Sequence, residues 1–245
     1  MNILVCIKQV GDNGDMNRFD AFALEEALGL KEQYDGQFLE PIFVDVVTIG
    51  GQAASEIIRR AFGMGADKGF HIVTRKTVYV PPFVTASKLA AVAAKTPYDL
   101  ILTGIMSEDL MEGQTGPMLA EIMGFPCAAG VVKTGLPTND NAVFLEREME
   151  NGFRESLEIR LPAVLTIQAG INTPRYPSLS KMLAARQKKI ITLAETDLFP
   201  EPIQAKESYL SMEYPEKTRA GHEIKGTLAD QAKQLFNFLR KKDLI

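Results

Sequence analysis

Short apolar runs alternate with helical patterns through the first hundred residues. Four apolar runs have the length of strands buried on both faces: residues 3–7, 42–49, 69–73 and 100–103. Three segments with helical spacing lie between them: residues 20–33, 53–64 and 81–95. This alternation predicts a doubly wound, mostly parallel α/β sheet of the Rossmann-like type, with helices on both faces.

The pattern changes after residue 141. Three strand candidates follow each other closely, with no helix between them: AVFLERE (142–148), SLEIRL (156–161) and PAVLTIQ (162–168). The pair Asn151-Gly152 supplies a turn between the first two. We therefore expect an antiparallel addition to the sheet.

Beyond Ile191 the chain becomes polar, with too few apolar residues to form a core of its own. It ends in a predicted helix, residues 227–241, with an apolar stripe formed by Leu228, Ala232, Leu235, Phe236 and Leu239. We expect an α/β domain at 1–190 and a C-terminal arm and helix at 191–245. The pattern leaves open whether that helix packs on a partner or folds back on its own domain.

Composition narrows the class of protein. The chain has 245 residues, a net charge of −4 and a pI of about 5.4, so nucleic acid is not an expected partner. No apolar run reaches membrane-spanning length, and no signal or transit peptide is visible, so we expect a cytoplasmic protein without membrane insertion. Cys6 and Cys127 lie in apolar sequence and are predicted to be core thiols.

The loop at 104–116 is the predicted ligand site, because ligands of doubly wound sheets bind beyond the carboxyl ends of strands. Thr115 or Gly116 stands where a helix N-cap belongs, with Pro117 in the first turn. A helix start of this kind suits a phosphate, and Ser107 and Gln114 add side-chain donors. The alternative is a glycine-rich connection that only caps a helix. The sequence contains neither a P-loop nor a GxGxxG motif.

A second candidate lies in residues 161–189, where a strand runs into a loop with Pro174 and Pro177 and then into the basic cluster 186–189. The prolines stiffen the loop and could hold Leu179 out as a docking element. The alternative is an ordinary strand–loop–helix connection. We interpret the acidic positions Glu25 and Glu26, and the strand segment 146–148, as solvated charges.

Catalytic chemistry is not indicated. The sequence shows no Ser–His–acid motif and no Cys–His pair, and the two histidines, His71 and His222, are far apart. We therefore expect no catalytic site in this chain.

Residues 161–179, LPAVLTIQAGINTPRYPSL, closely resemble the signature of the beta subunit of electron-transfer flavoproteins. The resemblance extends over nearly the whole chain, in the family's order, through ILVCIKQV (3–10), NRFDAFALEEALGLKE (17–32), FGMGADKGFHI (62–72), GIMSEDLMEGQTGPMLAEIMGFP (104–126), LEREMENG (145–152) and TRAGHEIKG (218–226). It implies an electron carrier subunit, without a catalytic site of its own, that pairs with an alpha subunit holding most of the FAD. Electrons would pass between acyl-CoA-type dehydrogenases and a downstream acceptor.

The resemblance also implies roles for particular residues. This chain would bind a structural AMP through Cys6, Asn17, Arg18, Phe19, Asp20, Ile49, Gly104, Ser107, Asp109, Gly113, Gln114, Thr115 and Gly116. The recognition loop would lie within 174–189, with Tyr176, Leu179 and Met182 docking on the dehydrogenase and Leu179 as the anchor. The C-terminal arm and helix would pack on the alpha subunit.

The chain departs from the family pattern in three places. Only residues 11–16 stand where members have a β-hairpin insertion, and Asn13 replaces an aromatic residue that approaches the flavin. Of the consecutive aspartates common in the nucleotide loop, only Asp109 is present. Thr115 stands where electron-bifurcating members have valine, which favours AMP. The alternatives are a bifurcating subunit with a second FAD in this site, and a stand-alone adenine-nucleotide sensor.

Overall fold

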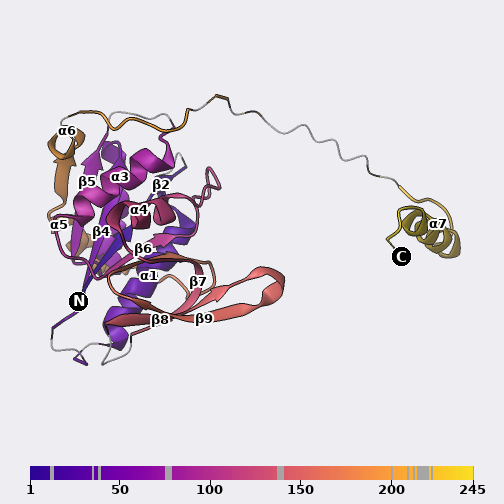
Figure 1. Cartoon of the computed structure of the whole chain (residues 1–245), viewed down its shortest axis with the longest axis horizontal. Coiled ribbons are helices and arrows are strands. Elements are labelled where there is room, and N and C mark those ends of the chain that lie inside the picture. The colour runs from indigo at the N-terminus through magenta and orange to yellow at the C-terminus, as the bar shows by residue number, and fades with distance from the viewer. Residues whose placement is uncertain are drawn as a thin grey trace. The chain divides into compact units, whose positions relative to one another are not determined.

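The computed structural model describes residues 1–11, 14–34, 36–37, 40–74, 79–136, 141–199, 201–208, 210–211, 213, 221 and 223–244. The chain divides into two compact units, Met1–Tyr209 and Leu210–Ile245 (Figure 1). The first contains the sheet and its covering helices, and the second contains the C-terminal helix.

A nine-stranded sheet forms the centre of the first unit, in the order β11-β5-β4-β1-β6-β10-β7-β8-β9. The strands are β1 (Asn2–Cys6), β4 (Phe43–Gly50), β5 (Lys68–Val73), β6 (Leu100–Gly104), β7 (Cys127–Gly135), β8 (Ala142–Glu148), β9 (Arg154–Arg160), β10 (Ala163–Ile167) and β11 (Ile191–Ala194). All neighbours from β11 to β7 pair in parallel, whereas β7–β8 and β8–β9 pair antiparallel. The predicted doubly wound, mostly parallel sheet is confirmed.

Helices cover both faces of this sheet (Figure 1). They are α1 (Arg18–Gln33), α2 (Ser55–Met64, preceded by the 3-10 turn Gln52–Ala54), α3 (Pro82–Ala93), α4 (Thr115–Met123), α5 (Leu179–Gln187) and α6 (Glu195–Leu198). Ile3 and Val5 of β1 join the core beneath α1 and α2, whereas Leu4 and Cys6 join the core beneath α3 and α4. Successive side chains of a strand point to opposite faces, so one apolar run supplies both cores.

Strands β10 and β7 differ from the sequence prediction. Residues 163–167 are not part of the antiparallel addition: β10 lies between β6 and β7 and is parallel to both. All five of its residues are buried, which fits a central parallel strand better than an edge hairpin. Strand β7 was not predicted, because its sequence CAAGVVKTG contains residues of low strand propensity.

The short segment before α1 forms a small antiparallel hairpin of β2 (Gln9–Val10) and β3 (Asp15–Met16). Thus the place of the family insertion keeps a minimal hairpin. The position of the missing aromatic, Asn13, lies outside the described residues.

The first unit extends beyond the predicted boundary at 190. Strand β11 adds to the sheet beside β5, and Lys88 of α3 forms an ion pair with Glu195 of α6 at 2.9 Å. The compact unit therefore continues to residue 209.

Helix α7 (Leu228–Lys241) lies in the second unit and confirms the predicted C-terminal helix. Its N-cap Thr227 accepts the Asp230 N–H, and the Asp230 carboxylate accepts the Thr227 N–H in return. None of its residues is buried in the structure, although its apolar stripe includes Leu235 and Phe236. No helix among the described residues is long and apolar enough to cross a membrane.

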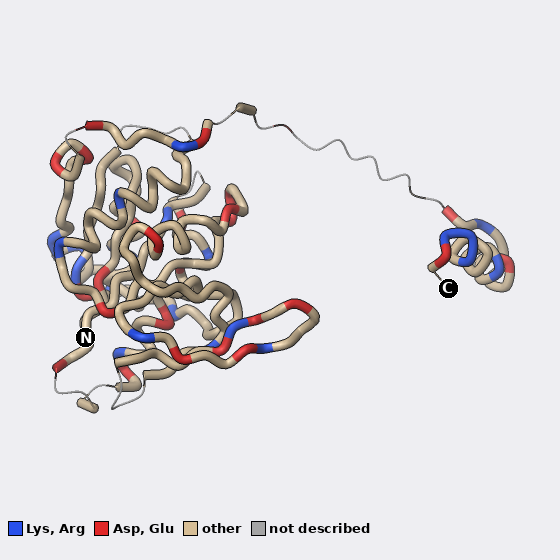
Figure 2. The backbone as a smooth tube through the Cα atoms, in the orientation of Figure 1, with Lys and Arg blue, Asp and Glu red and all other residues tan. Residues whose placement is uncertain are grey.

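The β8–β9 hairpin carries charge of both signs along its length (Figure 2). Arg147 pairs with Glu155 at 2.6 Å and Lys133 pairs with Glu146 at 2.7 Å. The interpretation of residues 146–148 as solvated charges therefore holds for the exposed Glu148 and the partly exposed Arg147, whereas the Glu146 side chain is only 19% exposed and is paired.

Candidate functional site

The strand order reverses at β1, which lies between β4 and β6. From β1 the chain moves outward to β4 and β5, and α3 then returns it to β6 on the other side. In such sheets the carboxyl ends of the two strands at the reversal border a crevice where ligands bind. Most of the predicted nucleotide residues lie along this edge.

Asp20 bridges the two strands of this crevice. Its Oδ2 accepts the Lys8 N–H, just beyond β1, at 2.7 Å, and its Oδ1 accepts the Gly104 N–H at the end of β6 at 3.0 Å. Because Asp20 is only 6% exposed, loss of water raises its pKa to about 7. The hydrogen bonds from Lys8, Asn17 and Gly104 oppose this rise. Burial, and to a smaller extent the charge of the same carboxylate, also raises the pKa of the Cys6 thiol.

Asn17 joins the start of α1 to the predicted ligand loop. It is the N-cap residue, yet its side chain does not cap the helix. Instead its Nδ2 donates to the Met106 carbonyl at 2.9 Å, and its Oδ1 accepts the Glu108 N–H at 3.1 Å. The Glu108 carboxylate in turn accepts the Arg18 N–H at 3.3 Å. Loop and helix are therefore fixed to each other by reciprocal hydrogen bonds.

The acidic side chains of the loop are engaged within the protein. Asp109 pairs with Lys8 at 2.7 Å; burial alone would raise the Asp109 pKa, but the hydrogen bond and charge of Lys8 lower it. Glu112 accepts the Tyr79 hydroxyl at 3.0 Å. Since these carboxylates already have partners within the protein, their repulsion of an anionic ligand is weaker than that of the same number of unpaired carboxylates.

Helix α4 begins at Thr115, with Gln114 as its N-cap. The N-cap was predicted at Thr115 or Gly116 and lies one or two residues earlier; Pro117 is in the first turn, as predicted. The amides of Thr115 and Gly116 belong to the first turn, where no intrahelical acceptor exists, and Pro117 has no N–H. Two backbone donors and the positive end of the helix therefore face the loop.

Packing within the protein explains the glycines at positions 104 and 116. A Cβ on Gly116 would lie 2.6 Å from Thr166 Cγ2 and 2.8 Å from Thr103 Oγ1, because α4 packs closely on β6 and β10. A Cβ on Gly104 would lie 2.5 Å from Asp20 Oδ1 and 2.6 Å from Phe19 Cβ. Close approach of helix to strand requires glycine at both positions, whether or not a ligand binds.

The other predicted nucleotide residues lie on the same edge or in the same loop. Cys6 ends β1 and is buried, and Ile49 lies half-buried near the end of β4. Ser107 and Gly113 belong to the loop, where the Ser107 N–H donates to the Glu112 carbonyl at 3.2 Å. Lys8 and Met111 also lie at this edge and in this loop, although neither was predicted as a site residue. Lys8 was detectable as a lone cation directly after a buried strand, whereas nothing in the sequence marks the left-handed Met111, with φ 55° and two-thirds of its side chain exposed.

The predicted docking residues differ in exposure. Leu179, at the start of α5, is 78% exposed and Tyr176 is 88% exposed. Ser178 caps α5 by accepting the Lys181 N–H. Met182 is half-buried, with its sulfur close to Gly63 of α2, where a Cβ would lie 2.6 Å away.

The acidic face of α1 is not solvated as we had interpreted it. The Glu25 side chain is only 12% exposed and pairs with Arg175 at 2.8 Å. Glu26 accepts the Thr134 hydroxyl at 2.5 Å and the Asn172 amide at 2.8 Å. The interpretation failed because the partners are about 110 to 150 residues away in sequence, beyond the reach of a local charge pattern.

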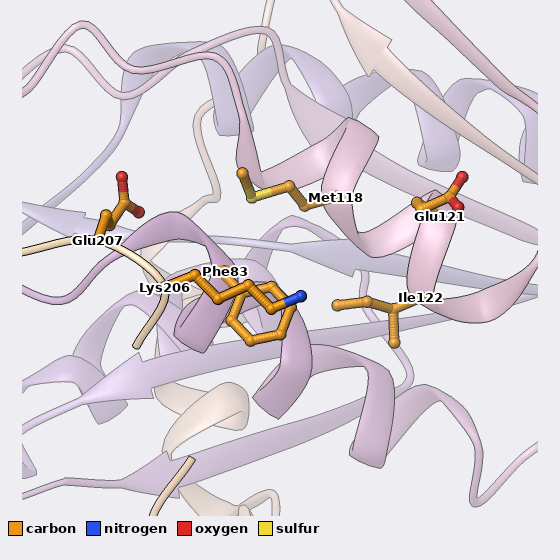
Figure 3. A pocket seen from close by; sticks show the side chains of 6 residues that line it. All are labelled: Phe83, Met118, Glu121, Ile122, Lys206 and Glu207. Carbon is orange, nitrogen blue, oxygen red and sulfur yellow. The ribbon is translucent and has the colours of Figure 1, made fainter. Parts of the chain in front are cut away.

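A hollow of about 400 Å³ lies elsewhere, between α3 and α4 and the segment that follows α6 (Figure 3). Phe83, Met118 and Ile122 line it with apolar surface, and the Lys206 ammonium lies 4.4 Å from the centre of the Phe83 ring. None of the predicted site residues lines it.

Among the described residues, no group of three or more His, Cys, Asp or Glu side chains could hold a metal ion. His71 is buried and its Nε2 lies 3.2 Å from the Gly50 carbonyl, which is a structural contact; His222 lies outside the described residues. Cys6 is buried as predicted, but Cys127 is exposed at the start of β7, so the prediction of a core thiol was wrong there.

The sheet order and the crevice at its reversal define a Rossmann-like, doubly wound α/β protein. The family model "Electron transfer flavoprotein domain" matches residues 4–198. The chain is 33% identical to the electron transfer flavoprotein subunit beta of Bacillus subtilis over 96% of this chain and 90% of that one. It is 33% identical to the protein of that name from Methylophilus methylotrophus, over 93% of this chain and 86% of that one. It is 32% identical to the human protein of that name, over 89% of this chain and 82% of the human one. The chain belongs to the electron transfer flavoprotein family, as its sequence motifs predicted.

Proposed function

We propose that this chain is the beta subunit of a heterodimeric electron-transfer flavoprotein and that it binds AMP in the crevice between β1 and β6. The proposal extends what the names of its relatives say: they are beta subunits, which implies an alpha subunit as partner. The alpha subunit would hold most of the FAD, and this chain would form one wall of that site. The heterodimer would carry electrons between acyl-CoA-type dehydrogenases and a further acceptor, without independent catalysis.

The AMP assignment rests on one observation: Asn17 and Asp20 fix the loop in front of α4 by hydrogen bonds. These two residues connect the ends of β1 and β6 to the loop through four hydrogen bonds: to Lys8, Gly104, Met106 and Glu108. The loop is thereby held beside a helix start whose two free amides suit a phosphate. The donor chemistry thus fits a mononucleotide phosphate.

The nucleotide is tested by its stoichiometry in the purified heterodimer. The chain is co-expressed with an alpha subunit of the same family and organism, the complex is denatured, and the released FAD and AMP are quantified by chromatography. One FAD and one AMP per heterodimer are expected. Two FAD and no AMP would replace the AMP assignment by a bifurcating subunit with a second flavin. A stable chain that binds adenine nucleotide but no alpha subunit would favour the stand-alone sensor.

Docking forms the second half of the proposal. We assign the loop from Tyr176 to Met182 to contact with the dehydrogenase, with Leu179 as the anchor. The support is its exposure: a leucine that is 78% exposed at the first position of a capped helix contributes little to the core and is presented to solvent. Met182 supports the loop from beneath in this proposal, through its contact with Gly63.

A further inference from the structure

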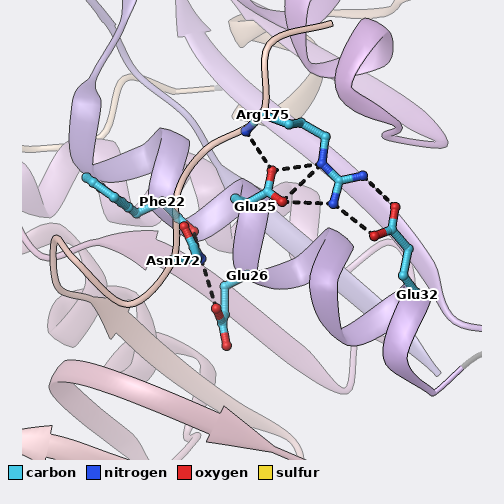
Figure 4. Close-up of polar contacts among 6 residues, drawn as sticks. All are labelled: Phe22, Glu25, Glu26, Glu32, Asn172 and Arg175. Atoms are coloured by element: carbon cyan, nitrogen blue, oxygen red, sulfur yellow. Dashed lines mark hydrogen bonds and ion pairs between the residues drawn. The ribbon is translucent and has the colours of Figure 1, made fainter.

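Arg175 directly precedes the exposed loop 176–182 and is bound to α1 by its main chain and its side chain together (Figure 4). Its guanidinium donates to both oxygens of Glu25, from Nη2 at 2.8 Å and from Nε at 2.9 Å. Its Nη2 also donates to Glu32 Oε2 at 2.9 Å. Its backbone N–H donates to Glu25 Oε2 at 3.0 Å. A bidentate arginine–carboxylate pair fixes direction as well as distance.

The two carboxylates are placed for this role by the helix. Glu25 and Glu32 are about two helical turns apart and therefore lie on one face of α1. The planar guanidinium lies between them, which a lysine ammonium cannot reproduce. The hydrogen bond and charge of Arg175 lower the Glu32 pKa, as expected for a formed ion pair.

A second attachment lies three residues earlier. The Asn172 amide donates to the Phe22 carbonyl at 3.1 Å and to the Glu26 carboxylate at 2.8 Å (Figure 4). The segment between β10 and the exposed loop is therefore fixed to α1 at two successive points.

On its other side the loop lies on α2. Pro177 and Met182 pack where a Cβ on Gly63 would be 3.0 Å and 2.6 Å away, respectively. The Arg60 guanidinium carbon lies 5.7 Å from the centre of the Tyr176 ring. The loop is thus supported by two helices while its Leu179 stays exposed.

We propose that Arg175 is the positioning residue of the docking loop: its ion pairs with Glu25 and Glu32 hold residues 176–182 so that Leu179 is presented in one orientation. This inference rests on the proposed function, in which Leu179 contacts a dehydrogenase. An anchor presented in one orientation loses less conformational entropy on binding. Leu179 itself is exposed and adds little to the order of the loop, so we assign the part of that order that comes from α1 to the ion pairs of Arg175.

The experiment uses the heterodimer with Arg175→Gln and, as a matched control, Arg147→Gln. Arg147 also pairs with a glutamate, and its side chain is 31% exposed against 28% for Arg175, but it lies on the β8–β9 hairpin. Hydrogen exchange of residues 176–182 is measured by mass spectrometry, together with thermal unfolding. Electron transfer from a purified acyl-CoA dehydrogenase of the same organism gives kcat and KM.

Arg175→Gln is expected to speed exchange in 176–182 at least tenfold and to raise KM for the dehydrogenase at least fivefold, with kcat changed less than twofold. Arg147→Gln is expected to leave the exchange rate of residues 176–182, KM and kcat unchanged. Arg175→Lys keeps the positive charge but cannot form the bidentate pair. Its exchange rate and KM are therefore expected to lie between those of wild type and Arg175→Gln. Should Arg175→Gln unfold, Glu32→Gln removes one of the two partners and is expected to show the same effects in smaller size.

A failure of the positioning role and a failure of the docking role give different results. If Leu179→Ala slows electron transfer but Arg175→Gln matches Arg147→Gln in exchange and KM, the positioning role is overturned and docking through the loop stands. If Leu179→Ala leaves electron transfer intact, docking through this loop is overturned, whatever the exchange data show.

Discussion

The carboxylate of Asp20, at the start of α1, accepts the backbone N–H of Gly104, at the end of β6, at 3.0 Å. The contact is close enough that a Cβ on Gly104 would lie 2.5 Å from the same carboxylate oxygen. Because Asp20 also accepts the Lys8 N–H, one buried group holds both sides of the crevice together. The geometry of the candidate nucleotide site therefore depends on this carboxylate.

The first prediction is that Asp20 makes stability fall as the pH rises. Burial raises its pKa from 3.8 to about 7, so the folded chain binds this proton more tightly than the unfolded chain does. The resulting stabilisation is fully present below about pH 4 and is lost as the pH rises to about 7. Asp20→Asn removes the titration, and its cost in free energy of unfolding should be about 2 kcal/mol smaller at pH 7.5 than at pH 5. Urea unfolding of both proteins at the two pH values measures this, and an equal cost at both would contradict it.

The second prediction concerns Gly116. A valine there meets Thr166 and Thr103 at distances below 3 Å, so Gly116→Val should destabilise the first unit by about 1–3 kcal/mol through overpacking. It should also move the amides of α4 and reduce the AMP recovered per heterodimer, while FAD stays. Gly29→Ala is the control, because a Cβ at Gly29 has no atom within 4 Å. If a measurably destabilised Gly116→Val protein still released one AMP per heterodimer, Gly116 would be needed for packing but not for AMP binding.

The third prediction concerns the anchor. Leu179→Ala should weaken docking on the dehydrogenase about tenfold or more, since burial of a leucine contributes about 1.5–3 kcal/mol. Its thermal stability and flavin content should hardly change, because the side chain is 78% exposed. Leu102→Ala, in the fully buried centre of β6, is the contrast and should cost about 2–5 kcal/mol of fold stability. A large loss of melting temperature with Leu179→Ala would mean that Leu179 supports the fold.

The fourth prediction tests the apolar stripe of α7. Leu235→Asp should prevent or strongly weaken assembly with the alpha subunit, because it places a charge in a surface expected to be buried there. Asn237→Asp introduces the same residue two positions further along the helix, away from the stripe, and should assemble normally. Deletion of 227–245 should abolish the heterodimer. Size-exclusion chromatography of the co-expressed chains distinguishes these outcomes, and normal assembly by Leu235→Asp would contradict the role of the stripe.

The sequence was sufficient for the first four parallel strands, β1, β4, β5 and β6. Buried strands such as β1 are continuous apolar runs, and helices such as α2 have a clear apolar stripe and end at a glycine, so local pattern and final structure agree. The position of β10 could not be predicted in this way. The apolar sequence of β10 would be the same in a strand that follows a hairpin and in a strand at the centre of a sheet. Only its pairing with β6 and β7 shows which of the two it is.

The candidate site was predictable to the level of its loop and helix start, because both follow a buried strand at the carboxyl edge. Its side-chain contacts were not. Asn17 occupies an N-cap position but bonds to Met106 and Glu108, about ninety residues away. Glu25 resembles an ordinary surface acid until Arg175 is brought next to it. Such long-range pairs leave no periodic signal in a single sequence.

The outer strand of the hairpin, β9, has one more consequence. It ends the sheet, and no strand of the described part of the chain pairs with its outer row of backbone donors and acceptors. Such an edge invites a strand of another molecule and is a starting point for aggregation. Arg154, Glu158 and Arg160 alternate along its exposed side, and a strand that added there would have to strip water from all three. We therefore expect the charges of this hairpin to oppose self-association through its open edge, and replacing Glu158 and Arg160 by valine should make the chain aggregate at lower concentration.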